Sequence, residues 1–187
     1  IQIPTPTSGP YTARFTGSLQ WRGRGIPLSG FLAVDPDAGA RMEIRDPLGG
    51  VSLVFFAGPG ECAFLRPSDG AQAAWSAPDR ALPFGAKDFW FLLAGTPPSP
   101  NLEPRSRRSG AEWRWRNAAG RVALVEDAPE SGPAPFSSAL LRGPGGAELR
   151  LALSAVEARS VAPEALRPPA PAEKEVSASD LLSEIRP

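Results

Sequence analysis

The sequence predicts a mainly β protein, a curved antiparallel sheet or half-barrel of about ten or eleven strands with a short helical lid. Apolar and polar residues alternate from Tyr11 to Arg22, the period of a strand with one face in water. The 187 residues include 23 prolines and 19 glycines, which favour short strands and turns over long helices. A dense apolar run at 84–93 interrupts the strand pattern, which favours a lidded open barrel over a sandwich.

Six strands are expected before the apolar run, joined by turns rich in glycine, proline and aspartate. They cover residues 11–22, 26–34, 41–45, 51–57, 61–66 and 71–76. The turn at 35–39 resembles the start of a calcium loop, but it lacks the remaining ligands of the twelve-residue pattern. We therefore interpret it as a simple turn.

The second half of the chain begins with the expected helix at 84–93, which is stopped by Gly95 and the prolines that follow it. Residues 96–110 read as a polar loop, whose arginines either face solvent, the interpretation we favour, or contact acidic lipid or an acidic partner. Strands then resume by alternation and hairpin turns. They cover residues 111–116, 122–125, 136–141 and 149–153.

Both ends of the chain differ in composition from the centre. Residues 1–10 read as a flexible lead-in, and residues 161–187 as a Pro/Ala-rich tail, so the sheet domain is expected to span residues 11–160. Within the tail, Ser177 and Asp180 have the spacing of a capping box, which predicts a short helix.

The composition excludes most enzyme classes. There is no histidine and only one cysteine, which excludes His-dependent nucleophiles, His-ligated metals, internal disulfides and cysteine metal cages. The 20 basic residues equal the 20 acidic ones, which argues against a nucleic-acid binder. The adjacent carboxylates Glu126 and Asp127 are more typical of a strand end than of an acid–base pair. We expect no catalytic residue, no metal and no cofactor, and hence no enzyme.

The longest apolar run, residues 89–94, is far too short to span a membrane. The sequence starts at Ile1 without a methionine, so we expect a natural start upstream of it.

Large aromatic residues lie at alternating strand positions, and two interpretations of them stay open. Phe15, Trp21, Phe55, Trp113 and Trp115 either form an ordinary core, which periodicity alone favours, or line a concave space that holds a hydrophobic ligand.

The turn Asp46-Pro47-Leu48-Gly49 places a large aliphatic side chain at a hairpin tip. Either Leu48 folds back against a neighbouring strand, or it serves as an apolar wedge for a bilayer or a partner. Full burial of such a side chain is worth about 1.5–3 kcal/mol.

Two stretches resemble LolB, the outer-membrane lipoprotein receptor. Residues 40–56 (ARMEIRDPLGGVSLVFF) resemble its strand–loop–strand around an Asn/Asp-Pro-Leu-Gly turn. Residues 83–97, which end in Leu-Leu-Ala-Gly-Thr-Pro, resemble its later helix. The resemblance covers roughly residues 11–160.

This resemblance implies a LolA/LolB-like half-barrel that receives the acyl chains of lipoproteins, or lipid, from a periplasmic LolA-like carrier and places them in the inner leaflet of the outer membrane. It implies a lipid anchor in the precursor, ahead of Ile1, and it places the membrane-inserting loop on Pro47, Leu48 and Gly49. The implied lipid-binding cavity is lined by apolar residues of the strands and the helix: Phe15, Leu19, Trp21, Met42, Ile44, Leu53, Phe55, Trp90, Trp113 and Trp115.

An alternative is a non-catalytic interaction module of a cell-envelope assembly, which uses the same curved sheet with a filled core. The Pro/Ala-rich tail with its terminal helix supports this alternative, because it has the character of a docking segment.

Overall fold

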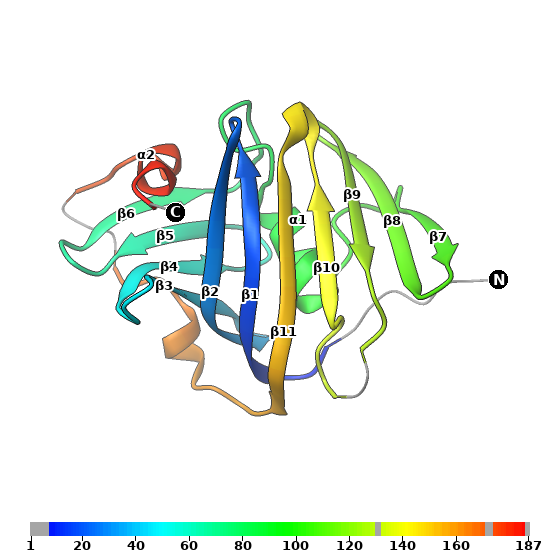
Figure 1. Cartoon of the computed structure of the whole chain (residues 1–187), viewed down its shortest axis with the longest axis horizontal. Helices are drawn as coiled ribbons and strands as arrows, with labels where there is room; N and C mark the ends of the chain where they lie inside the picture. Colours follow the sequence, from blue (N-terminus) through cyan, green and yellow to red (C-terminus); the bar gives the residue numbers. More distant parts are fainter. Residues whose placement is uncertain (1–7, 130–131, 171–173, 186–187) are drawn as a thin grey trace.

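The computed structural model describes residues 8–129, 132–170 and 174–185, so most of the predicted lead-in, residues 1–7, lies outside the described residues. The described strands form one antiparallel sheet of 11 strands, in the order β6-β5-β4-β3-β2-β1-β11-β10-β9-β8-β7 (Figure 1). The strands are β1 (Tyr11–Trp21), β2 (Arg24–Asp35), β3 (Gly39–Arg45), β4 (Val51–Ala57), β5 (Cys62–Arg66), β6 (Ala71–Trp75), β7 (Glu103–Arg107), β8 (Gly110–Asn117), β9 (Gly120–Glu126), β10 (Ser138–Arg142) and β11 (Glu148–Ala158). The predicted fold class is confirmed.

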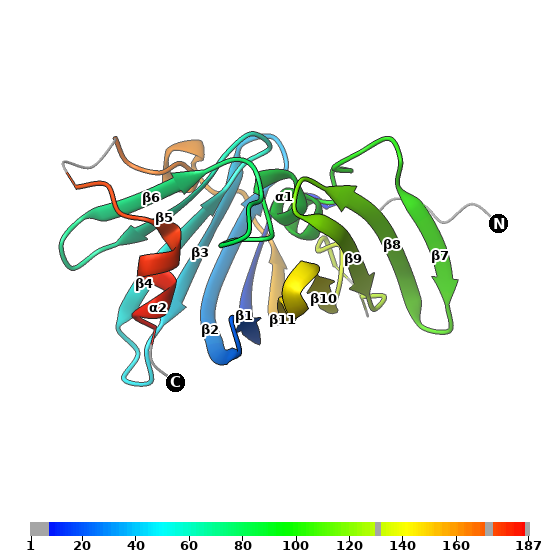
Figure 2. The ribbon, with the colours of Figure 1, turned by 90° about the horizontal axis from the view of Figure 1, so that it is seen from above.

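The sheet is open and strongly curved. The chain runs outward from β1 at the centre to the edge strand β6, and then crosses to the opposite edge at β7. From β7 it returns inward to β11, which pairs with β1. Figure 2 shows the sheet bent around α1 (Ala86–Ala94), the helix in the crossing segment. The crossing therefore places this helix on the inner face, which explains why a single apolar helix occurs in the middle of the sequence.

Strand alternation decides which side chains face α1. On β1 the buried residues Tyr11, Ala13 and Phe15 alternate with more exposed ones, and on β8 Trp113 and Trp115 do the same. The inner face is thus apolar, and the outer face carries most of the charged side chains.

The lid helix begins and ends close to where the sequence predicts. Gly85 is its N-cap, and the carboxylate of Asp88 accepts a hydrogen bond from the Gly85 backbone N–H (2.9 Å). Gly95 ends the helix in the left-handed region (φ 75°), where its N–H bonds to the carbonyl of Phe91. Most of its side chains are buried, in agreement with a run that is apolar on nearly all sides.

One predicted loop is a strand. Residues 103–107 form β7 rather than part of the polar loop expected over 96–110. All five residues of β7 are exposed, so the sequence has no burial alternation there, and the strand exists because it pairs with β8.

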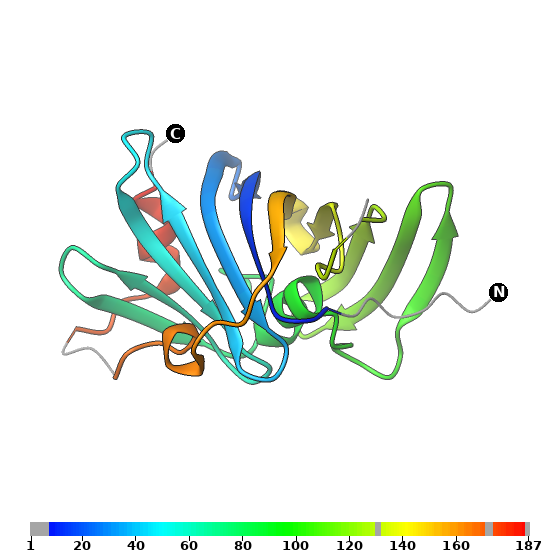
Figure 3. The ribbon, with the colours of Figure 1, turned by 90° about the horizontal axis from the view of Figure 1, so that it is seen from below.

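The tail returns to the sheet. A 3₁₀ turn, η2 (Pro163–Leu166), contacts β2 and β3, and α2 (Ala178–Ser183) contacts β5 and β6 (Figure 3). The predicted short helix is confirmed, and the side chain of Ser177 accepts the backbone N–H of Asp180 at its start. A second 3₁₀ turn, η1 (Pro144–Gly146), joins β10 to β11. No helix among the described residues is both long and apolar enough to cross a membrane.

Candidate functional site

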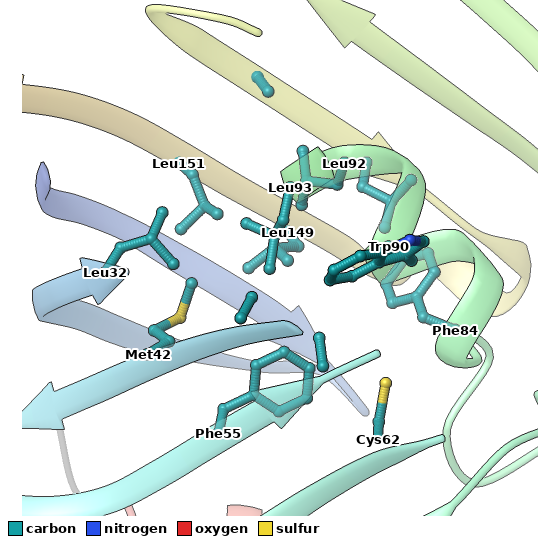
Figure 4. Close-up of a cluster of buried hydrophobic side chains, with 14 of the residues drawn as sticks. Leu32, Met42, Phe55, Cys62, Phe84, Trp90, Leu92, Leu93, Leu149 and Leu151 are labelled. Atoms are coloured by element: carbon teal, nitrogen blue, oxygen red, sulfur yellow. The ribbon is translucent and has the colours of Figure 1, made fainter. Parts of the chain in front are cut away.

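A small apolar cavity lies between the inner face of the sheet and the two helices. Its volume is about 50 Å³. In Figure 4, Met42, Phe55, Leu149 and Leu151 of the strands lie around it with Leu92 and Leu93 of α1. The lining side chains are all apolar, and they are Leu19, Trp21, Leu28, Met42, Ile44, Phe55, Phe64, Trp75, Leu82, Pro83, Phe84, Phe89, Leu92, Leu93, Leu149, Leu151 and Leu182.

The ten predicted cavity residues divide into two groups. Leu19, Trp21, Met42, Ile44 and Phe55 line the cavity. The other five are buried in the packed inner layer but do not line it, and they are Phe15, Leu53, Trp90, Trp113 and Trp115. The structure thus combines the two interpretations of the aromatic residues, a packed core and a residual apolar space within it.

Several lining residues were missed from the sequence. Leu149 and Leu151 alternate on β11 and could have been found by the same rule that found Met42 and Ile44. Leu182 could not, because its approach to the cavity depends on how the Pro/Ala-rich tail returns to the sheet.

Asp88 anchors the first turn of the lid. This carboxylate is only 2% exposed. It accepts hydrogen bonds from the Trp115 indole N–H (2.7 Å) and the Asn117 side-chain amide (2.9 Å), both on β8, in addition to that from Gly85. A buried charge is tolerated where several donors satisfy it, so these bonds fix the lid to the sheet.

Aromatic polar groups hold the rest of the crossing segment. The Tyr11 hydroxyl donates to the carbonyl of Leu93 (3.0 Å) at the end of α1. The Trp21 indole donates to the carbonyl of Ala81 (2.7 Å), and the Trp75 indole to that of Phe84 (3.1 Å). Trp21 and Trp115, which the sequence predicted as core or cavity residues, therefore also hold the lid through hydrogen bonds.

Helix α2 closes the cavity from a second side. Leu181, Leu182 and Ile185 are buried in the core cluster, and Leu182 reaches the cavity itself. Arginine side chains from the sheet hold the helix: Arg24 donates to the carbonyl of Ser183 (3.2 Å), and Arg66 pairs with Glu184.

The hairpin tip between β3 and β4 presents Leu48 to solvent. The side chain is 97% exposed, so it does not fold back onto a strand. The loop is nevertheless well organised, because the Asp46 carboxylate accepts the backbone N–H groups of Leu48 (2.9 Å) and Gly50 (3.0 Å), and Gly49 takes a positive φ of 87°.

The inner face offers little reactive chemistry. Burial raises the pKa of the Cys62 thiol, which keeps it protonated and unreactive. Within the described part of the chain, no group of three acidic or cysteine side chains could hold a metal ion.

Glu126 is a buried carboxylic acid on the inner face with a strongly raised pKa. It is 3% exposed, its Oε1 has no hydrogen-bond partner among the described residues, and burial raises its pKa to about 8. The carboxyl is therefore neutral near neutral pH. It remains buried and uncharged in an otherwise apolar surface.

Replacement of Glu126 by Gln should remove a pH dependence of stability. The native state holds the proton up to about pH 8, whereas the unfolded chain releases it near its ordinary value of 4.5. As the pH rises from 5 to 9, the free energy of unfolding of the wild type should therefore fall by roughly 2–4 kcal/mol more than that of Glu126→Gln. Urea unfolding at both pH values measures this, and an equal fall in the two proteins would contradict it.

Comparisons with solved structures identify the fold. The chain is similar to a LolA superfamily protein from Nitrosomonas europaea, with a TM-score of 0.52 and 9% identity over 89% of this chain and 92% of that one. It is also similar to an outer membrane lipoprotein-sorting protein domain from Vibrio parahaemolyticus, with a TM-score of 0.53 and 10% identity over 80% and 85% of the two chains. No family profile matches the sequence, and no curated protein matches it. The protein has the LolA-like fold.

Proposed function

We propose that the protein binds the acyl chains of lipids or lipoproteins on the inner face of its half-barrel, without chemical catalysis. The observation that carries this proposal is the wholly apolar cavity between the sheet and α1. Burial of an acyl chain is favourable by about 0.8 kcal/mol per CH₂, which needs no reactive side chain. The binding unit is residues 11–160, and α2, in the tail that follows, supplies a second cover.

Binding requires the cavity to widen. Its volume of about 50 Å³ is far below the ~300–1,000 Å³ of typical ligand pockets. The sheet is continuous from edge to edge, so space for a chain has to come from displacement of α1 or α2. Of the two, α2 is the shorter, and an isolated six-residue helix has little stability of its own.

Delivery to a membrane is the second part of the proposal. The exposed Leu48 on a well-ordered loop enters the bilayer at the inner leaflet of the outer membrane, with Pro47 and Gly49 beside it. The cargo comes from a periplasmic LolA-like carrier, and a lipid anchor ahead of Ile1 keeps the protein at that membrane. The similarity to a lipoprotein-sorting domain supports this assignment.

Replacement of Leu48 by Glu tests the membrane step. Transfer of a fluorescent diacyl lipid from the protein to phospholipid vesicles should slow about tenfold. The apolar Leu48 side chain inserts into the bilayer favourably, whereas a charged Glu side chain does so only at a cost in free energy. The free energy of unfolding should change by less than about 0.5 kcal/mol, because the Leu48 side chain is almost fully exposed.

Two control variants accompany this experiment. Leu48→Met keeps an apolar tip and should keep transfer, whereas Ser68→Glu adds the same charge at the exposed β5–β6 turn and should have no effect. Unchanged transfer by Leu48→Glu would remove the assigned role.

A second candidate function is an interaction module of an envelope assembly with a permanently filled core. The small volume of the cavity favours it. Mass spectrometry of lipid that co-purifies with the native protein, together with titration of a fluorescent fatty acid, separates the two. Absence of lipid and of saturable dye binding would favour the module.

A further inference from the structure

An arginine-lined groove lies on the outer face of the sheet, away from the apolar cavity. Its volume is about 670 Å³, and it is formed on β7, β8, β9 and β10 with the loop that precedes β7. Five arginines line it, Arg105, Arg114, Arg116, Arg121 and Arg142, against two glutamates. Because the whole chain has as many acidic as basic residues, this surface concentrates positive charge locally.

Strand register places these arginines side by side. Arg116 on β8 lies opposite Arg121 on β9. Ala123 on β9 pairs with Arg114 on one side and Arg142 on the other, so the small alanine lies between two long cationic side chains. Side chains at the intervening positions, such as Trp115 and Val122, are buried, so alternation directs the arginines outward.

Most of this charge is not neutralised within the described part of the chain. Arg114 pairs with Glu112, and Arg142 approaches Glu148 at 3.7 Å. No ion pair forms with Arg105, Arg116 or Arg121 among the described residues. Like charges held on adjacent strands repel one another, and an anion between them relieves that repulsion.

The shape and charge of the groove select its ligand. Guanidinium groups bind phosphate through paired hydrogen bonds, and a concave surface strengthens the attraction that a single sign of charge exerts. The volume of the groove lies in the range of small-molecule sites, roughly 300–1,000 Å³, so the groove is not a flat interface. We propose that the groove binds a phosphate-bearing group, either the headgroup of an anionic phospholipid or a free phosphorylated small molecule.

The test uses a double charge reversal at the opposed pair, Arg116→Glu with Arg121→Glu. Binding is measured in two arms, by co-sedimentation with phosphatidylglycerol/phosphatidylcholine vesicles and by calorimetric titration with inorganic pyrophosphate. Wild-type binding should weaken with added salt, and the double variant should bind at least about tenfold more weakly. Loss in the vesicle arm alone identifies a lipid headgroup as the ligand, and loss of pyrophosphate binding identifies the phosphate itself.

A matched control separates the groove from overall charge. Arg80→Glu with Arg159→Glu makes the same change in net charge at exposed positions outside the groove, and it should bind as the wild type does. All of these proteins keep Leu48 and the apolar cavity, so a difference between them reports on the groove alone. The test therefore remains valid even if the acyl-binding proposal fails. Equal losses in the two double variants, or no binding in either arm, would overturn the proposal.

Discussion

Replacement of Asp88 by Ala should lower the free energy of unfolding by about 3–5 kcal/mol. The substitution leaves the Trp115 indole N–H without an acceptor, takes one of the two acceptors of the Asn117 amide (the Pro83 carbonyl remains), and removes the acceptor for the Gly85 N–H at the start of α1. Unpaired buried donors cost more than the lost bonds alone, because they no longer exchange with water. Urea unfolding with tryptophan fluorescence measures the change.

Two further substitutions show whether this loss comes from the anchor. Asp88→Asn keeps the size of the side chain and one acceptor oxygen, so it should lose less than the alanine variant. Lys87→Ala removes an exposed charge one residue earlier on the same helix and should change the unfolding free energy by less than about 0.5 kcal/mol. An Asp88→Ala protein as stable as the wild type would mean that the hydrogen bonds of Asp88 do not hold the lid.

Replacement of Leu182 by Asp should increase the affinity for a fluorescent fatty acid about ten- to a hundredfold. Helix α2 is docked through Leu181, Leu182 and Ile185, and a charge at the residue that reaches the cavity releases it. In the wild type, a ligand has to displace α2, so the free energy that docks α2 on the sheet is subtracted from the free energy of ligand binding. Each 1.4 kcal/mol removed from this docking free energy raises the ligand affinity about tenfold.

The matched control for this variant is Ser183→Asp. It adds the same charge to the same helix at an exposed position, and it should bind the probe with wild-type affinity. Circular dichroism before titration establishes that both proteins keep the sheet. Equal affinities of Leu182→Asp and the wild type would show that α2 does not limit access to the cavity.

Much of the sheet could be predicted because its signals are local. The alternation from Tyr11 onward and the glycine- and proline-rich turns indicate where the strands lie along the chain and which of their residues face inward. The hairpin tip at Leu48 could also be located, but the sequence left open whether Leu48 folds back onto a strand, and the structure shows it exposed. By contrast, β7 has no buried face, and so it carries no periodicity to read.

The features that depend on long-range contacts could not be read from the sequence. Trp21 and Trp115 were identified as apolar, but their hydrogen bonds join residues that are distant in the chain, to Ala81 and Asp88 respectively. The amount of open space is also a long-range property. It depends on how far α1 and Leu182 fill the concave face, and neither periodicity nor composition reports on that.

Photo-crosslinking with a diazirine-bearing fatty acid tests the central claim, acyl-chain binding on the inner face, most directly. The labelled peptides, identified by mass spectrometry, should contain cavity residues such as Met42, Leu93 and Leu182, and excess unlabelled fatty acid should compete. Phe31, an exposed aromatic residue at 40%, serves as the internal control and should remain unlabelled. Labelling at Phe31 without labelling of the cavity residues, or labelling that unlabelled fatty acid does not compete, would contradict acyl-chain binding inside the half-barrel.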